Sequence, residues 1–120
     1  MSKVEVEKRQ REERNQKLLE LTNSIPVEKD ALFAHPVQWG LVDAALIDSK
    51  LRPWITKKIE EYLGASDDDL VSFIVRHIKG QISPAALVEE LHAAFDKDAE
   101  VFVTKLWRLI IFESQARALA

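Results

Sequence analysis

Four basic side chains lie within nine residues of this chain, around a tryptophan. They are Lys50, Arg52, Lys57 and Lys58, and Trp54 stands between them. Ammonium and guanidinium groups neutralise phosphates, and an indole can stack on a nucleobase, so this set is typical of a surface that contacts a phosphate backbone. A helix that began here would add its free N-terminal N–H groups, which favour anions. The pattern predicts a local phosphate-binding patch.

The same residues also have a plainer interpretation. Lys57 and Lys58 stand three residues before Glu60 and Glu61, and exposed ion pairs of this kind contribute little to stability. On that interpretation the lysines only make one helix face hydrophilic. The sequence does not decide between a phosphate-binding patch and a solvated helix face. For Trp54, which lies beside an apolar stripe, we expect a structural anchoring role in preference to base stacking.

The charge balance limits how such a patch could work. The net charge is −3; residues 1–29 carry 7 basic and 6 acidic side chains, and residues 30–120 carry 10 and 14. A nucleic-acid binder usually has a basic excess, so binding here must rest on a local patch and weaken steeply with salt. The N-terminal segment offers further candidates, namely Arg9, Arg11, Arg14 and Lys17. Weaker candidates, whose placement the sequence does not fix, are Arg76, Lys79, Lys105 and Arg108, the last two expected on the wet side of their helix.

Other kinds of chemistry find little support in the sequence. Without cysteine, thiolate metal sites and disulfides are excluded, and His35, His77 and His92 form no i,i+4 pair. His77 is interpreted as a hydrogen-bonded core residue, and the acidic run 67–69 as helix capping, since it lacks the spaced ligands of a calcium loop. No nucleophile motif, Gly-rich phosphate loop or membrane-length apolar run is found. We expect no enzyme, no metal, cofactor or small-molecule substrate, and no membrane association.

The helix that would carry the basic patch has, at its two ends, residues that favour a helix start and a helix end. Pro53 suits a first helical turn, where its missing N–H has no partner, and Gly64 suits the left-handed position just past a helix end. Between them Ile55, Ile59 and Tyr62 recur at three- and four-residue spacing, which predicts one apolar stripe.

Other helices are predicted on both sides of it. Residues 3–22 alternate acidic and basic side chains and predict a solvated helix. Residues 30–48 predict a short helix and then a longer one that begins at Pro36 and includes Gly40, which suggests a close helix approach. Towards the C-terminus the predicted boundaries are Ser66 to Gly80, Ser83 with Pro84 to Phe95, and about 96 to 119 for a last, very apolar helix.

No alternating run predicts a strand. The sequence therefore predicts an all-α fold, a compact bundle of four principal helices plus a shorter helix that leads into it, preceded by a charged helical flank. We place the flank, partly ordered or helical, at residues 1–29 and the bundle at residues 30–120.

The tripeptide Pro53, Trp54 and Ile55 is a structural signature that gives one domain family its name. The stretch RPWITKKIEEYLG, with LFAHPVQWGLVDAAL before it and AEVFVTKLWRLIIFESQA after it, resembles the PWI domain family over roughly residues 30–118. It is most similar to the C-terminal PWI domains of splicing regulators in which an RNA-recognition domain and an Arg/Glu-rich region come first.

This resemblance implies a nuclear pre-mRNA-splicing module that binds RNA, and also DNA, with little sequence preference, aided by a basic flanking segment. It further implies partners among splicing factors or components of the small nuclear ribonucleoprotein that marks 5′ splice sites. The alternative is a protein-interaction domain that docks a spliceosomal partner, which the acidic balance of residues 30–120 favours. A third hypothesis is a bundle that only stabilises the end of a longer protein.

Overall fold

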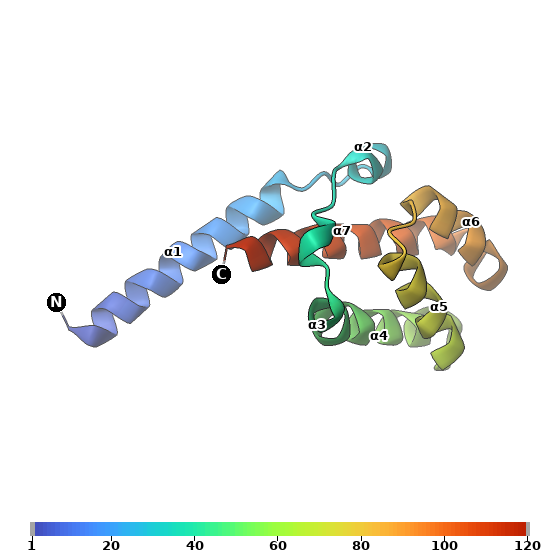
Figure 1. The fold of residues 1–120 in the computed structure, drawn as a ribbon, viewed down its shortest axis with the longest axis horizontal. Helices are drawn as coiled ribbons and strands as arrows, with labels where there is room; N and C mark the ends of the chain where they lie inside the picture. Colours follow the sequence, from blue (N-terminus) through green and yellow to red (C-terminus); the bar gives the residue numbers. More distant parts are fainter. Residues whose placement is uncertain (1, 120) are drawn as a thin grey trace.

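The computed structural model of the chain describes residues 2–119, and these residues form helices and short connections without a strand. The all-α prediction is therefore confirmed. A compact group of helices fills one end of the molecule, and helix α1 projects from it (Figure 1), which gives overall dimensions of 59 × 29 × 25 Å.

Helix α7, Asp98–Ala118, is the central element of the bundle. Its apolar side chains point in several directions, so neighbours cover it on most sides, as its sequence predicts. The packing is partly aromatic: the ring of Phe102 stacks on Phe95 at 4.9 Å between centroids, and Trp107 meets the edge of Trp39 at 6.0 Å. The buried residues of α7 are Ala99, Phe102, Val103, Leu106, Trp107, Ile110, Ile111 and Ser114.

The signature helix continues a run that is already helical. Helix α3, Ala44–Leu46, leads into a π-helical turn, η2, Ile47–Leu51, and then into α4, Arg52–Leu63. Pro53 stands in the first turn of α4, as predicted, and the Arg52 N–H donates to the Ile47 carbonyl, five residues back. A proline ring would clash with the carbonyl four residues before it, so this wider turn accommodates Pro53 without ending the run.

The longer helix predicted from Pro36 is wrong. Helix α2, Lys29–Ala34, ends at His35, whose extended backbone (ψ 131°) is the conformation that a following proline imposes. Between α2 and α3 the chain makes only a single 3₁₀ turn, η1, Trp39–Leu41, and Gly40 has nothing within 4 Å of where a Cβ would lie. The predicted close helix approach at Gly40 is therefore also wrong. This irregular segment instead turns its apolar side chains, Val37, Trp39 and Val42, onto the core.

Helices α5, Asp68–Lys79, and α6, Pro84–Phe95, complete the bundle. Gly64 ends α4 with φ of 76°, the left-handed conformation that glycine adopts at low cost, and Ser83 caps α6 by accepting from the Ala86 N–H. The predicted cap of α5 is displaced by one residue, because Asp67 and not Ser66 accepts from the Leu70 N–H, at 3.0 Å.

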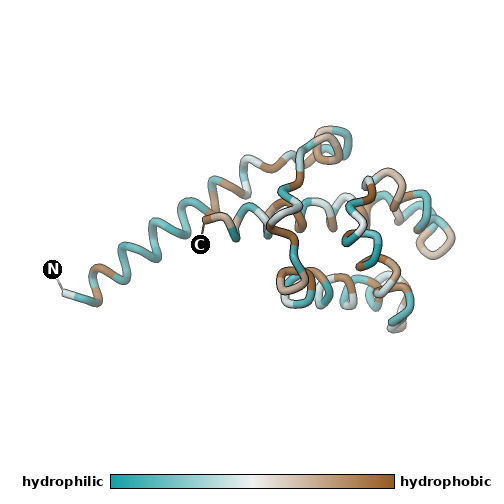
Figure 2. The backbone as a smooth tube through the Cα atoms, in the orientation of Figure 1, coloured by the Kyte–Doolittle hydropathy of each residue, from teal (hydrophilic) through white to brown (hydrophobic). Residues whose placement is uncertain are grey.

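Helix α1, Lys3–Ser24, buries no residue and is hydrophilic along most of its length (Figure 2). It lies beside α7 through its C-terminal half, where Leu21 packs against the core. There the Arg108 Nη2 donates to the Thr22 carbonyl at 3.3 Å, and the Arg108 Nε is buried. The expectation that Arg108 lies on the wet side of the last helix is only partly right, because Arg108 is half-buried against α1; Lys105, one turn earlier, is exposed as expected.

Candidate nucleic-acid interface

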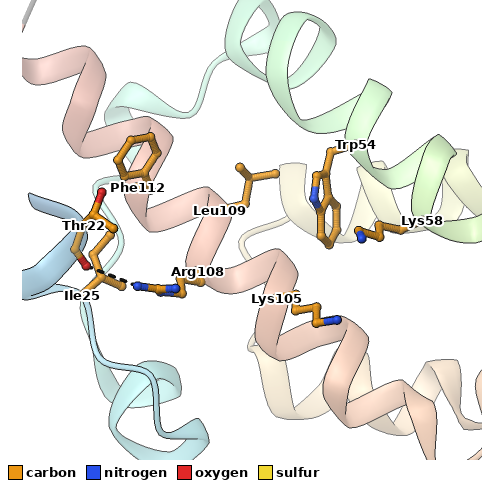
Figure 3. Close-up of a pocket in the computed structure, with 8 residues that line it drawn as sticks. All are labelled: Thr22, Ile25, Trp54, Lys58, Lys105, Arg108, Leu109 and Phe112. Atoms are coloured by element: carbon orange, nitrogen blue, oxygen red, sulfur yellow. Dashed lines mark hydrogen bonds between the residues drawn. The ribbon is translucent and has the colours of Figure 1, made fainter. Parts of the chain in front are cut away.

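A groove of about 440 Å³ lies where α1, α4 and α7 come together. Helix α7 forms its floor, the start of α4 forms one wall, and the last turn of α1 with Ile25 forms the other (Figure 3). The lining residues are Thr22, Ile25, Trp54, Lys58, Lys105, Arg108, Leu109 and Phe112, and we call this the Trp54 groove.

The Trp54 groove is electropositive on a molecule that is net acidic. Its lining contains three cations, Lys58, Lys105 and Arg108, and no carboxylate, whereas the whole chain carries −3. Negatively charged ligands would be attracted to this concave surface, since a cleft lined by one sign of charge focuses the electric field.

Trp54 is half-buried between the core and the groove. Its ring lies 5.7 Å from that of Phe102 between centroids, and Lys58 Nζ lies 5.8 Å from the indole centroid, within the range of a cation–π contact. Ile55, beside it in the sequence, is fully buried. Trp54 is thus anchored in the bundle while its remaining surface lines the groove.

The three cations differ in what they already contact. Lys58 Nζ lies 3.0 Å from Glu61 Oε2. Water screens an ion pair at the surface, so this pair contributes little to stability. Arg108 is committed to α1 through the Thr22 carbonyl and compensates for the absence of a basic residue in the last turn of that helix. Lys105 forms no ion pair with any residue between 2 and 119 and is exposed. Lys105 is therefore the cation most available to a ligand.

A second groove, of about 510 Å³, adjoins the first along α7, because Phe112 lines both. Arg14 of α1 and Lys50 of the π turn line it, together with Glu113 and Arg117. Arg117 is engaged with Asp43, the cap of α3. This Arg117 hydrogen bond, together with the Leu46 N–H, lowers the pKa of the Asp43 carboxyl below its ordinary value, and the same contact raises the pKa of Arg117.

The predicted nucleic-acid-binding residues do not form one patch in the structure. Lys58 lies in the Trp54 groove, while Lys50 and Arg14 lie in the adjoining one. Arg52 is held by Asp48, with Nε to Oδ1 at 3.3 Å. The predicted basic residues that line neither groove are Arg52, Lys57, Arg9, Arg11 and Lys17.

Lys105 and Arg108, which the sequence gave only as weaker candidates, line the Trp54 groove. Their spacing shows that they share a face of a helix, yet no local pattern shows that this face meets Trp54. Their place depends on how α7 packs against α4 and α1.

Among residues 2–119, no three side chains of the metal-ligating types come together. His77 is buried, as expected, but its Nε2 finds no hydrogen-bond partner within this range, so the expected core hydrogen bond is not found at that nitrogen. The described helices include none of a length and hydropathy suited to crossing a membrane.

Comparison with known proteins identifies related sequences. The PWI domain family matches residues 49–118. RNA-binding protein 25 of Homo sapiens is 39% identical over 106 residues, which cover 88% of this chain and 13% of the human protein. The U1 snRNP-associated protein usp107 of Schizosaccharomyces pombe is 37% identical over 108 residues, covering 87% of this chain and 16% of the relative.

A third relative is more distant. The U1 small nuclear ribonucleoprotein component SNU71 of Saccharomyces cerevisiae is 30% identical over 89 residues, covering 73% of this chain and 14% of the yeast protein. The chain thus spans only about a seventh of the length of these curated relatives.

Proposed function

This chain belongs to the PWI domain family, and on that premise we propose that it is the nucleic-acid-binding module of a nuclear pre-mRNA-splicing factor. The names of its relatives support this role, since one is an RNA-binding protein and two belong to or associate with the U1 small nuclear ribonucleoprotein. In this proposal the module contacts RNA, and also DNA, with little sequence preference, and its wider partners are splicing factors or ribonucleoprotein components.

The Trp54 groove is the observation that carries the proposal. Three cations and no carboxylate line it on a chain whose net charge is −3. A surface whose only role was solubility would carry both positive and negative side chains, as the rest of this molecule does. Phosphates are the ligand whose charge fits such a lining.

The basic residues predicted from the sequence, together with Lys105, have a place in this scheme. Lys58 and Lys105 neutralise phosphates at the Trp54 groove, and Lys50 and Arg14 continue the path in the adjoining groove. Phosphate contacts carry no sequence information, which agrees with a weak preference among sequences. The outlying positions that add to this path are Arg52 and Lys57 on the bundle and Arg9, Arg11 and Lys17 on α1.

The flank and the bundle then have separate tasks. Residues 1–29 act as a charged extension, and residues 30–120 form the bundle whose α4 and α7 supply the groove cations. Arg9 lies 13 residues before Thr22 on α1, about 20 Å along the helix axis, so only a long ligand reaches both.

A charge-matched pair of double variants tests the proposal. Fluorescence anisotropy of labelled single-stranded RNA is measured at several salt concentrations for Lys58→Gln with Lys105→Gln, and for Lys79→Gln with Lys97→Gln as control. Both variants lose two lysine charges, but only the first pair lines the groove. We expect the groove variant to bind about tenfold more weakly and its salt slope to fall by about 1.4, that is 0.7 for each lost phosphate contact, while the control changes little.

Equal weakening by both variants would show that net charge alone governs binding and would remove the groove from the proposal. Circular dichroism of both proteins verifies that the helices persist.

A protein-docking function is the second candidate, and the excess of acidic residues over 30–120 favours it, since such a surface suits an Arg-rich partner. Capture from nuclear extract with and without nuclease separates the two functions. Partners lost on digestion were held by RNA, whereas partners retained at low and moderate salt support docking.

A further inference from the structure

We propose that the Trp54 groove also docks a short acidic peptide with one large apolar side chain, and that this peptide competes with RNA for the groove. The occupant is a segment of a partner protein in which glutamates or aspartates flank a phenylalanine, tryptophan or leucine. This inference rests on the proposed function and deepens it, because it gives the same site a means of regulation.

The groove has an apolar lining that phosphates do not use. Four of its eight lining residues are aliphatic or aromatic, and three of them, Trp54, Leu109 and Phe112, are only half-buried against the core (Figure 3). An apolar side chain that covers this surface is stabilised by leaving water, whereas a phosphate gains nothing from it. The cavity of about 440 Å³ lies within the range of roughly 300–1,000 Å³ that is usual for ligand pockets, so it has room for one large side chain.

The cations lie close enough to the apolar surface to pair with residues beside the inserted side chain. Lys58 Nζ is 5.8 Å from the Trp54 ring centroid, and consecutive residues of a peptide are about 3.8 Å apart. A carboxylate next to a side chain that packs on Trp54 is therefore within reach of Lys58. Lys105, which lines the same groove and is exposed, is available to a second carboxylate.

The charge of the groove selects an acidic occupant and makes it a competitor of RNA. No carboxylate lines the groove, so an acidic peptide meets no like charge there, while a basic peptide would be repelled by three cations. Either ligand draws Lys58 away from Glu61, which costs little because their ion pair lies at the surface. Both ligands need Lys58 and Lys105, so only one of them is bound at a time.

The first experiment changes only the ligand, so it does not depend on any variant folding. Fluorescence anisotropy follows three labelled peptides: one with two glutamates on each side of a phenylalanine, one with serine in place of the phenylalanine, and one with glutamine in place of every glutamate. We expect each replacement to weaken binding about tenfold, because one removes apolar burial and the other removes charge pairing. The unlabelled phenylalanine peptide should displace labelled RNA from the chain, and the glutamine peptide should not.

The outcomes separate this inference from the proposed function. RNA that binds but is not displaced, or equal affinity for the phenylalanine and serine peptides, would overturn the inference and leave RNA binding in place. A peptide that binds where RNA does not would overturn the proposed function, and the competition with it, while leaving peptide docking in place. Absence of both kinds of binding would overturn both.

A matched pair of leucine variants then assigns the effect to the groove. Leu109→Gln makes part of the groove floor polar, and Leu63→Gln makes the same change at a partly exposed leucine of α4 outside the groove. We expect Leu109→Gln to abolish most of the tenfold difference between the phenylalanine and serine peptides, and Leu63→Gln to preserve it. Circular dichroism verifies that both variants remain helical. A full difference in a folded Leu109→Gln protein would overturn the assignment to the Trp54 groove.

Discussion

Helices α1 and α7 are almost equal in length, 22 and 21 residues, yet they differ in every property that packing confers. Eight residues of α7 are buried, and none of α1. Helix α1 consists of good helix formers with charges of both signs, whereas β-branched and aromatic residues, which are weaker helix formers, interrupt α7. The comparison teaches that burial of the apolar faces, and not intrinsic propensity, holds the central helix in place.

The two helices also make different contributions to the candidate site. Helix α7 supplies the floor of the Trp54 groove together with Lys105 and Arg108. Helix α1 supplies one wall of this groove at its last turn, Arg14 of α1 lines the adjoining groove, and the N-terminal part of α1 projects from the bundle (Figure 1). A rigid helix therefore positions the groove, and a solvated helix extends the charged surface.

The largest difference between the helices should appear when the same substitution is made in each. Leu106→Ala on α7 removes a side chain that is 0% exposed, and Leu19→Ala on α1 removes one that is 55% exposed. We expect Leu106→Ala to lower the free energy of unfolding by about 2–5 kcal/mol, because it loses apolar burial and leaves a cavity. Leu19→Ala should change it by less than about 0.5 kcal/mol. Urea denaturation measures both, and similar losses would contradict the comparison.

A smaller effect is expected where the two helices are joined. Arg108→Met keeps the aliphatic stem but removes the hydrogen bond to the Thr22 carbonyl. We expect a loss of about 1 kcal/mol and faster amide exchange over the last turn of α1, with α5 and α6 unaffected. Lys105→Met, one turn earlier and exposed, serves as the control. Exchange in α1 that stays unchanged would show that Leu21 alone docks the helix.

The smallest effect concerns the C-terminal end of α7, where Arg117 contacts Asp43. The lowered pKa of the Asp43 carboxyl means that its contribution is fully present above the ordinary value and is lost as pH falls through the lower folded-state value. Asparagine caps helices as well as aspartate, so Asp43→Asn removes only the charge.

We expect Asp43→Asn to have a slightly lower melting temperature at neutral pH. The difference from the unmodified protein should shrink as pH falls below the ordinary pKa of 3.8 and vanish only below the lowered folded-state pKa of Asp43, where both side chains are neutral. Melting curves at a series of pH values measure this, and a difference that persists at the lowest pH would contradict the assignment to the Asp43 charge.

Much of the fold could be predicted from local signals. Ser83 with Pro84, and Gly64, mark helix boundaries that the structure confirms, because capping and left-handed turns depend on only a few adjacent residues. The apolar stripe through Ile55 and Ile59 is likewise buried as its spacing predicts.

The errors occurred where local signals competed with packing. Pro36 suggested the start of a helix, but the chain there turns Trp39 onto Trp107 of α7 instead. Arg108 has the side chain of a solvated helix face, and only the docking of α1 places it under cover. A single sequence gives no direct signal for contacts between residues so far apart in the chain.

By itself, the sequence determined the helical class, most helix boundaries, the family signature at Pro53 to Ile55 and the lysines that follow it. These features rest on hydrogen bonds and spacings within one turn of a helix, so neighbouring residues are enough to specify them. The tertiary structure alone decided that Lys58 of α4 meets Lys105 of α7 beside Trp54, and that α1 closes the groove. The physical reason is that helix packing depends on which apolar faces fit one another, and this fit joins residues that are far apart in the chain.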